Sequence, residues 1–420
     1  MKTTLLMLAM CTSAAVSAAP TVSNVTMSQD ASRMVTIGYT LSGEPGIVTV
    51  DIQTNGVSIG GQHLTYFAGD VNRLVQPGAR TATWMPLKAW PDNKVTENVQ
   101  AVVSAWATNA PPNYMVVSLT AENTVRFYAN AESVPFGITN DLYKTDEVVL
   151  RKCPAANVEW RMGSPATPAE KGRTAARETP HYVTLGEDFY IGVYPVTQRQ
   201  YQRVKGSRPS NFNLDADYMT RPVEKVSYED IRGATSGHDW PSDGHVVGES
   251  SFMGVLRSFS GVDGFDLPTD AQWEFACRAG CGAALYNGQE LENETESAIL
   301  KALARYRYSG GFADNGQSAP SASCTAENGT AKVGSYEAND WGIYDMLGNV
   351  FEWCLDWYQE SPVGFDASTG PTSGMDRVRR GGSWYTAAAK NCRCAYRTSL
   401  APGTVDNSVG FRLACSALLH

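Results

Sequence analysis

The stretch LPTDAQWEFACR at residues 267–278 decides how the larger part of this chain is interpreted. Thr269 can cap a helix, and Gln272 follows three residues later at the spacing of a capping box, so the pattern predicts a helix over residues 269–278. The surrounding region is rich in glycine and holds seven of the ten tryptophans. Its other regular signals are a strand at 187–193 and short helices at 197–204 and 227–234. Most of the remainder is expected to be loop, held by aromatic packing and cross-links.

The region that precedes this one in the sequence has a different pattern, with short apolar and β-branched runs separated by Gly, Pro and Asn. Four of these runs predict strands, at 34–41, 47–52, 99–106 and 125–128. The pattern is typical of a small immunoglobulin-like β-sandwich over residues 20–140. We expect a junction at 133–145 and a second domain over 146–420. The first domain has no residue cluster that looks catalytic, so we expect it to be an adhesive or spacer module.

Length and composition agree with two folded domains. The 420 residues exceed one ordinary domain, and 43% hydrophobic against 18% charged residues argues against long disordered tracts. The formal charge of −9 is not the basic footprint of a nucleic-acid-binding protein. No apolar run approaches the ~20 residues that a transmembrane helix needs. The oligomeric state is not predictable from these data.

Residues 1–18 are expected to be a cleaved export signal, which would make the protein secreted, periplasmic or attached to the cell surface. Lys2 supplies a positive charge, residues 5–10 form a short apolar core, and VSA at 16–18 is a cleavage site of small residues. A lipid anchor at Cys11 is less favoured, because the bulky Met10 precedes it. Cleavage leaves eight cysteines, all at or beyond Cys153, and export would permit disulfides.

Seven motifs after residue 160 occur in the order seen in one known family. They are RMGS at 161–164, FYIGVYPVT at 189–197, RPVEKVSY at 221–228, LPTDAQWEFACR at 267–278, NDWGIYDMLGNVFEW at 339–353, RVRRGGSW at 377–384 and GFRL at 410–413. Together they resemble the sulfatase-modifying-factor family, also called the formylglycine-generating-enzyme family. The resemblance implies that residues 146–420 form an α+β domain with an irregular variant of the C-type lectin fold.

The resemblance also implies an oxidase that converts a cysteine of a sulfatase to formylglycine, with copper(I) held by two cysteines. In such enzymes the first copper cysteine lies three residues after Gly-Gly-Ser, and here Thr386 stands at that distance from Ser383. The second would fall at 389–391 or, one step away, at Cys392. A hydroxyl does not replace a thiolate as a ligand of copper(I). We therefore expect that the family positions Ser383, Thr386 and Cys392 bind no copper and have no oxidase activity of the usual kind.

Cys392 and Cys394 form a C-x-C pair, for which disulfide chemistry is favoured over a relocated metal site. The resemblance implies a bridge between Cys277 and Cys394. The other cysteines cannot be paired from the sequence, and they are Cys153, Cys281, Cys324, Cys354, Cys392 and Cys415. Free buried cysteines would give the same pattern.

Calcium is the cofactor that the resemblance favours. Asp345, Gly348, Val350 and Glu352 match a calcium-binding stretch of the family residue for residue. The two acidic side chains would supply carboxylate oxygens and the other two residues backbone carbonyls, which are the hard ligands that calcium prefers. The alternative is a tight turn in which the two acidic residues act as caps.

The segment 380–413 also resembles the variable region of retroelement-diversified binding proteins, in which residues between fixed positions contact the ligand. Here those contacts would include Tyr385, Asn391, Tyr396 and Arg397, with Trp384 in the core. Tyrosine offers contact area at little entropic cost, and asparagine offers adaptable hydrogen bonds.

These observations leave two functional hypotheses and one structural alternative. The first is an exported binding protein, with a protein or glycan ligand, whose domain has lost the copper pair. The second is an active oxidase that modifies sulfatases or another exported protein and uses Cys392. The alternative is a purely structural domain with no ligand-sized groove near Tyr385 and Arg397.

Overall fold

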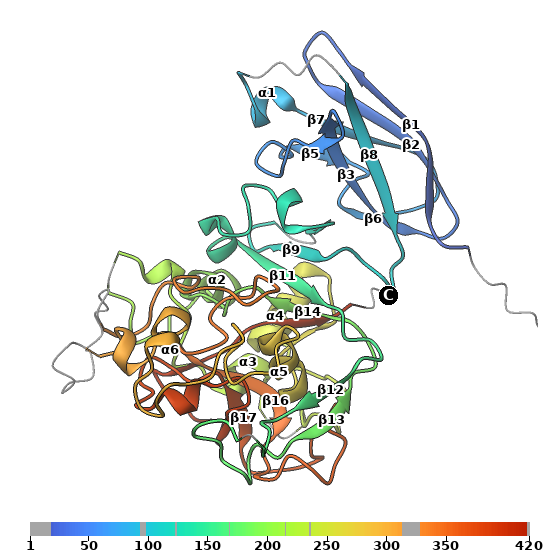
Figure 1. The fold of residues 1–420 in the computed structure, drawn as a ribbon. Coiled ribbons are helices and arrows are strands. Elements are labelled where there is room, and N and C mark those ends of the chain that lie inside the picture. Colours follow the sequence, from blue (N-terminus) through green and yellow to red (C-terminus); the bar gives the residue numbers. More distant parts are fainter. Residues whose placement is uncertain are drawn as a thin grey trace, which may run out of the picture. The chain divides into compact units, whose positions relative to one another are not determined.

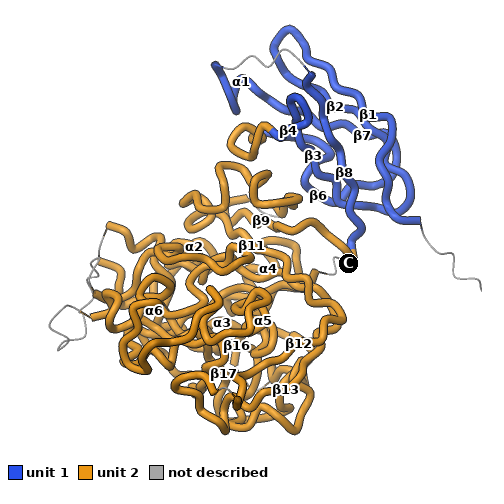
Figure 2. The backbone as a smooth tube through the Cα atoms, in the orientation of Figure 1, with its two compact units in different colours: residues 1–58, 66–108 blue, residues 59–65, 109–420 orange. Residues whose placement is uncertain are grey.

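The computed structural model describes residues 18–92, 98–121, 124–167, 169–214, 216–234, 237–312 and 328–417. The predicted signal peptide lies outside these residues except for its last position, and so does Cys324. The chain divides into two compact units (Figure 2). The first is Met1–Ser58 with Tyr66–Thr108, and the second is Ile59–Thr65 with Asn109–His420. Within the described ranges, no helix combines the length and the apolarity required to span a bilayer.

The first unit consists of two sheets that share an apolar core (Figure 1). One sheet has the order β1 (Thr21–Gln29), β2 (Val35–Ser42), β7 (Gly78–Trp84), β5 (Phe67–Gly69). The other has the order β4 (Val57–Ser58), β3 (Gly46–Thr54), β6 (Arg73–Val75), and β8 (Val99–Trp106) also pairs with β3. Tyr39 and Leu41 from one sheet pack with Val48 and Val75 from the other. The expected all-β unit of two layers is therefore present, while its immunoglobulin-like character stays a prediction.

The β2 strand shows why this unit folds as it does. Its residues alternate between buried and half-exposed positions, and Val35, Ile37, Tyr39 and Leu41 point into the core. A short helix, α1 (Pro86–Ala89), follows β7.

The boundary between the units lies near residue 108, not at the predicted junction of 133–145. The run 125–128 forms β10 (Val125–Tyr128), which pairs with β9 (Tyr114–Ser118) in a sheet of the second unit. The expected junction contains the short helices η1 (Ala131–Ser133) and η2 (Asp141–Lys144). Val134 and Tyr143 are buried there. A run of four residues with strand propensity predicts a strand, but it carries no information about which sheet the strand joins.

The second unit is built on two separate sheets and a hairpin. The larger sheet has the order β10, β9, β11 (Glu147–Cys153), β14 (Phe189–Gly192), β20 (Ala414–Ser416), β15 (Phe265–Asp266). The smaller has the order β18 (Arg397–Leu400), β17 (Arg377–Arg380), β16 (Phe351–Trp357), β19 (Val409–Gly410). The hairpin joins β12 (Glu159–Met162) and β13 (His181–Thr184).

Short helices and long loops complete the second unit. The helices are α2 (Gln198–Lys205), α3 (Tyr228–Arg232), α4 (Phe252–Ser260), α5 (Asp270–Arg278), α6 (Ala298–Leu303), η3 (Tyr218–Thr220), η4 (Arg307–Ser309) and η5 (Ala389–Cys392). The predicted capping box at α5 is present, because Thr269 accepts from the Gln272 N–H and the Gln272 side chain accepts from the Thr269 N–H. The structure confirms a mostly β chain with few helices.

The loop Ile59–Thr65 comes from the sequence of the first unit but belongs to the second. The Gly61 N–H donates to the Glu132 carbonyl at 2.6 Å, and Leu64 is buried. A Cβ atom at position 61 would lie 2.3 Å from the Val134 carbonyl oxygen, so only glycine fits this close approach.

Candidate functional site

The candidate site is the segment that follows β17, where two glycines allow a sharp change of direction. Gly381 and Gly382 have φ values of 90° and 80°, which favour glycine. A Cβ atom at position 382 would lie 2.5 Å from the Cys392 sulfur. Gly382 is therefore needed for the thiol of Cys392, at the end of η5, to approach the start of the segment.

Ser383, Thr386 and Cys392 form one buried cluster. The Ser383 N–H donates to Thr386 Oγ1 at 2.8 Å, and the Thr386 N–H donates to the Ser383 carbonyl at 2.9 Å. The Cys392 thiol is hydrogen-bonded by the Thr386 side chain and the Ser383 backbone. The structure thus brings together the three family positions and places Cys392 against Thr386, which the sequence left open.

The chemistry of this cluster does not fit a copper(I) site. Burial raises the pKa of Cys392 to about 12, and the hydrogen bonds from Thr386 and Ser383 offset only part of the rise. The thiol is therefore protonated at neutral pH, and its neighbour is a hydroxyl instead of a second sulfur. Across the described ranges, no group of three or more His, Cys, Asp or Glu side chains is arranged to hold a metal ion.

Cys277 and Cys394 are brought together as the resemblance implied, but as two buried thiols and not as a disulfide. The Cys277 thiol is desolvated and hydrogen-bonded to Cys394, and both effects raise its pKa well above the usual value. The two thiols interact closely enough to shift the pKa of Cys277, and the bridge between them stays a prediction. The other described cysteines are free thiols as well: Cys153, Cys281, Cys354, Cys392 and Cys415.

Three of the four expected calcium ligands, Asp345, Gly348 and Val350, lie in the turn that leads into β16, and Glu352 is the second residue of that strand. Asp345 is buried with φ of 55°, and burial raises its pKa to about 6 although the Gly334 N–H donates to Oδ2 at 2.6 Å. Its Oδ1 accepts only a long bond of 3.4 Å from Asn349, so this oxygen has capacity for a cation. The Asp345 side chain therefore fits a hard cation.

Glu352 fits calcium less well. Its two oxygens accept from Arg412 at 2.5 and 2.7 Å, and Trp273 Nε1 donates to Oε2 at 2.7 Å. The carboxylate is fully buried, and its charge is already balanced by Arg412. Of the two expected acidic ligands, the one with free capacity is Asp345.

The expected ligand-contact residues divide into accessible and inaccessible ones. Tyr385 is 53% exposed, and Asn391 and Tyr396 are half-buried. Arg397 is buried, with Nε and Nη2 3.0 and 2.8 Å from Asp270 Oδ2, so its prediction as a contact is wrong. Its partner lies far away in the sequence, which is why no local pattern revealed the pair.

An aromatic cluster supports Tyr385 from behind. Trp384 is fully buried, as expected, and packs edge-on against Phe212 at 5.0 Å. Phe312 lies 5.2 Å from the Tyr385 ring, and the Arg307 guanidinium lies 4.7 Å above the Phe312 ring. Sequence reasoning did not single out Phe312 and Arg307, because they belong to none of the motifs.

Comparison with known proteins gives a consistent result for the second unit. A family model described as the sulfatase-modifying factor enzyme 1-like domain matches residues 153–417. The formylglycine-generating enzyme of Mus musculus is 33% identical over 199 residues, which cover 45% of this chain and 50% of that protein. The chaperone protein LppX of Paenibacillus barcinonensis is 30% identical over 221 residues, which cover 49% of this chain and 72% of that protein.

A kinase and a solved structure are also similar to this chain. The serine/threonine-protein kinase pkn1 of Chlamydia pneumoniae is 30% identical over 251 residues, which cover 56% of this chain. The chain spans only 34% of the length of that kinase. Among solved structures, Treponema denticola variable protein 1 has a TM-score of 0.47 and 27% identity, covering 64% of this chain and 95% of that one.

Proposed function

Because this chain belongs to the sulfatase-modifying-factor family, with a domain match over residues 153–417, we propose that it is an exported binding protein built on that domain. In this proposal the domain keeps the framework of the family and lacks the pair of thiols that would hold copper. The β-sheet unit before it acts as a spacer or adhesive module.

The observation that carries the proposal is the cluster of Thr386 and Cys392. One hydroxyl and one protonated thiol face each other at the place where an oxidase of the family would need two thiolates. Both side chains are buried, so the hydroxyl is part of a packed and hydrogen-bonded interior.

The proposed contact surface surrounds Tyr385. This side chain is half-exposed while its ring packs against Phe312 and Trp384, so it offers a rigid aromatic face to a partner. Asn391 and Tyr396 are the further expected contacts. We propose an exported protein or a glycan as the ligand of this surface.

The names of the relatives support a domain with several uses, because they include a kinase and a chaperone protein as well as formylglycine-generating enzymes. Calcium bound by Asp345 and the neighbouring backbone carbonyls would stabilise the turn before β16. We also propose that residues 1–18 act as a signal peptide that directs export of the protein.

The test is a copper(I) titration of the full chain in competition with a chromogenic chelator, followed by incubation with oxygen and a peptide containing Cys-x-Pro-x-Arg. We expect no stoichiometric copper binding and no aldehyde in the peptide. Stoichiometric copper together with aldehyde formation would instead establish the alternative, an active formylglycine-generating oxidase.

A pair of variants sharpens this test. Thr386→Cys places a second sulfur beside Cys392, so we expect it to gain copper(I) binding. Thr386→Ser changes the same position but adds no sulfur, so it should bind no more copper than the unmodified chain.

A further inference from the structure

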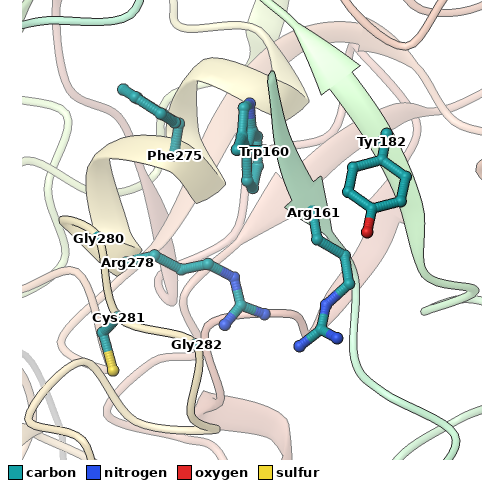
Figure 3. A pocket seen from close by; sticks show the side chains of 8 residues that line it. All are labelled: Trp160, Arg161, Tyr182, Phe275, Arg278, Gly280, Cys281 and Gly282. Atoms are coloured by element: carbon teal, nitrogen blue, oxygen red, sulfur yellow. The ribbon is translucent and has the colours of Figure 1, made fainter. Parts of the chain in front are cut away.

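A second candidate binding site lies at the C-terminal end of α5, in a pocket that we call the Arg161 pocket (Figure 3). Its volume is about 320 Å³, at the lower end of the range for small-molecule sites. Its lining residues are Trp160, Arg161, Tyr182, Phe275, Arg278, Gly280, Cys281 and Gly282. None of them belongs to the cluster of Ser383, Thr386 and Cys392.

One wall of the Arg161 pocket is aromatic and well supported. Trp160 lies on β12 and Phe275 on α5, with ring centroids 5.4 Å apart. Phe275 also packs against Trp341 at 5.4 Å, so its ring is held from two sides. Tyr182 on β13 is 70% exposed at the rim. These rings give a flat apolar surface that a planar ligand could cover.

The opposite side of the pocket carries two guanidinium groups. Arg278 is fixed in place, because it donates to Glu274 at 2.8 Å, to the Gly163 carbonyl at 2.9 Å and to the Ala283 carbonyl at 3.0 Å. These bonds use three of its five N–H groups and leave one on each terminal nitrogen. Arg161 is exposed, and no described residue forms an ion pair or hydrogen bond with its side chain. In Figure 3 the two guanidinium groups extend into the same space beside Gly282.

The two arginines differ in how far neighbouring carboxylates balance their charge. Glu274 binds Arg278 and also accepts from Arg380 Nη2 at 2.9 Å, and Glu170 is a second carboxylate close enough to act on Arg278. Arg161 forms no ion pair with any described residue, so its charge is the one available to a ligand. An anion entering the pocket would therefore meet one fixed and one adjustable guanidinium, an arrangement that suits the two oxygens of a carboxylate.

We propose that the Arg161 pocket binds a small organic carboxylate with a flat, apolar body. The carboxylate lies between Arg161 and Arg278, and the apolar body lies against Trp160 and Phe275. This site goes beyond the proposed function, because its ligand and its residues are separate from the surface around Tyr385.

Benzoate is the probe, titrated into the full chain by calorimetry at low ionic strength. Benzamide has the same shape without the charge, and inorganic phosphate has charge without the ring. We expect benzoate to bind measurably, to bind more weakly as salt is added, and to bind at least about tenfold more tightly than either control.

Matched variants locate the binding. Arg161→Gln should weaken benzoate binding about tenfold. The affinity of Arg161→Lys should lie between those of the unmodified chain and Arg161→Gln, because lysine keeps the charge but lacks the planar guanidinium. Arg208→Gln is the control, since Arg208 is another exposed arginine of the same unit that stacks on Tyr218 and does not line the pocket. It should leave binding unchanged.

Cys281 provides a readout inside the pocket, because it is half-buried while the other described cysteines are buried. Benzoate should slow alkylation of Cys281 by iodoacetamide, measured by peptide mass spectrometry, and benzamide should not. The proposal is overturned if benzoate and benzamide act alike, if phosphate binds as tightly as benzoate, or if Arg161→Gln binds benzoate as well as the Arg208→Gln control does.

Discussion

The two units of this chain are stabilised in different ways. The first has strands of up to nine residues in two sheets, and among its described residues no charged side chain is fully buried. The second has shorter strands and many loops, and its interior contains buried arginines. The most deeply buried of these are Arg232, Arg377, Arg380, Arg393 and Arg412. The first unit thus relies mainly on regular β-sheet hydrogen bonding, whereas the second also relies on buried charged side chains.

The difference follows from the need to pair backbone groups. In the first unit the ladders of β2 with β7 and of β3 with β8 pair the backbone groups with each other. In the second unit, side chains form hydrogen bonds with backbone carbonyls that the sheets leave unpaired. Arg412, for example, donates to the carbonyls of Gly192 and Tyr344, both at 2.9 Å. Arg412 also pairs with Glu352, which neutralises the charge that this role brings inside.

The largest expected effect comes from breaking one of these pairs. Arg393 contacts Glu170 at 2.9 Å and Glu178 at 2.7 Å, and all three side chains are buried. Arg393→Met would leave two carboxylates in the interior without their cation. We expect the second unit to lose roughly 3–5 kcal/mol of unfolding free energy. Hydrogen exchange resolved by peptide would measure the loss and show whether it is confined to that unit.

The matched control lies in the first unit. Arg73→Met removes the ion pair with Asp70, which has the same 2.9 Å separation but an exposed arginine. The expected loss is below about 1 kcal/mol. Equal losses in the two variants would mean that burial of the charges does not distinguish the units.

The second prediction concerns pH. Burial raises the pKa of Glu224 to about 7, although the Phe212 N–H donates to its carboxyl group at 2.9 Å. Between about pH 4.5 and 7 the folded chain therefore holds a proton that the unfolded chain has released. This contribution to stability is complete below pH 4.5 and is lost as the pH rises through 7.

Glu224→Gln keeps the acceptor and removes the titration. We expect it to reduce the pH dependence of the stability of the second unit across this range by up to about 1.4 kcal/mol per pH unit. The part that comes from Asp345, whose pKa is also raised by burial, should remain. Glu44→Gln, at an exposed carboxylate of the first unit, should leave the slope unchanged. Unfolding by urea at a series of pH values measures both variants, and a slope that Glu224→Gln does not reduce would assign the pH dependence to other groups.

A smaller effect is expected from calcium. If Asp345 binds the ion, calcium at ten times its dissociation constant should stabilise the second unit by about 1.4 kcal/mol and leave the first unchanged. Asp345→Asn keeps the shape and an oxygen acceptor but loses the charge, so the calcium effect should shrink. Thermal unfolding with calcium or with a chelator measures it, and an equal shift in both chains would place the ion elsewhere.

The smallest expected effect is that of a reductant. Because Cys277 and Cys394 are thiols in contact, reducing agents should not change the unfolding midpoint of the second unit. After denaturation without reductant, both residues should react with iodoacetamide. Mass spectrometry of the two peptides checks this, and a linked pair of peptides would show that the bridge implied by the family forms after all.

Local signals predicted local structure well. The capping box at Thr269 and Gln272 identified α5, and the apolar run at 99–106 gave β8 with the same bounds. Ser251, which caps α4 through the Gly254 N–H, is a signal of the same kind that was available and not used. Such features depend on residues within one or two turns of each other.

Features that depend on distant partners were not predictable. The site of Cys392 beside Thr386 requires the close approach at Gly382, which the sequence does not specify. The burial of Arg397 depends on Asp270, a residue of another element. Motifs therefore identified the members of the candidate site, and the fold determined which of them are accessible.

The loop Ile59–Thr65 has a consequence for how this protein can be divided. The chain passes from one unit to the other at 58–59, again at 65–66 and finally at 108–109. Ile59 and Leu64 are buried, so a second unit produced alone from residue 109 would lack two side chains of its own interior. The two units are interleaved in sequence, and exchanging the first one for another module in evolution or in the laboratory would require this short peptide to be retained.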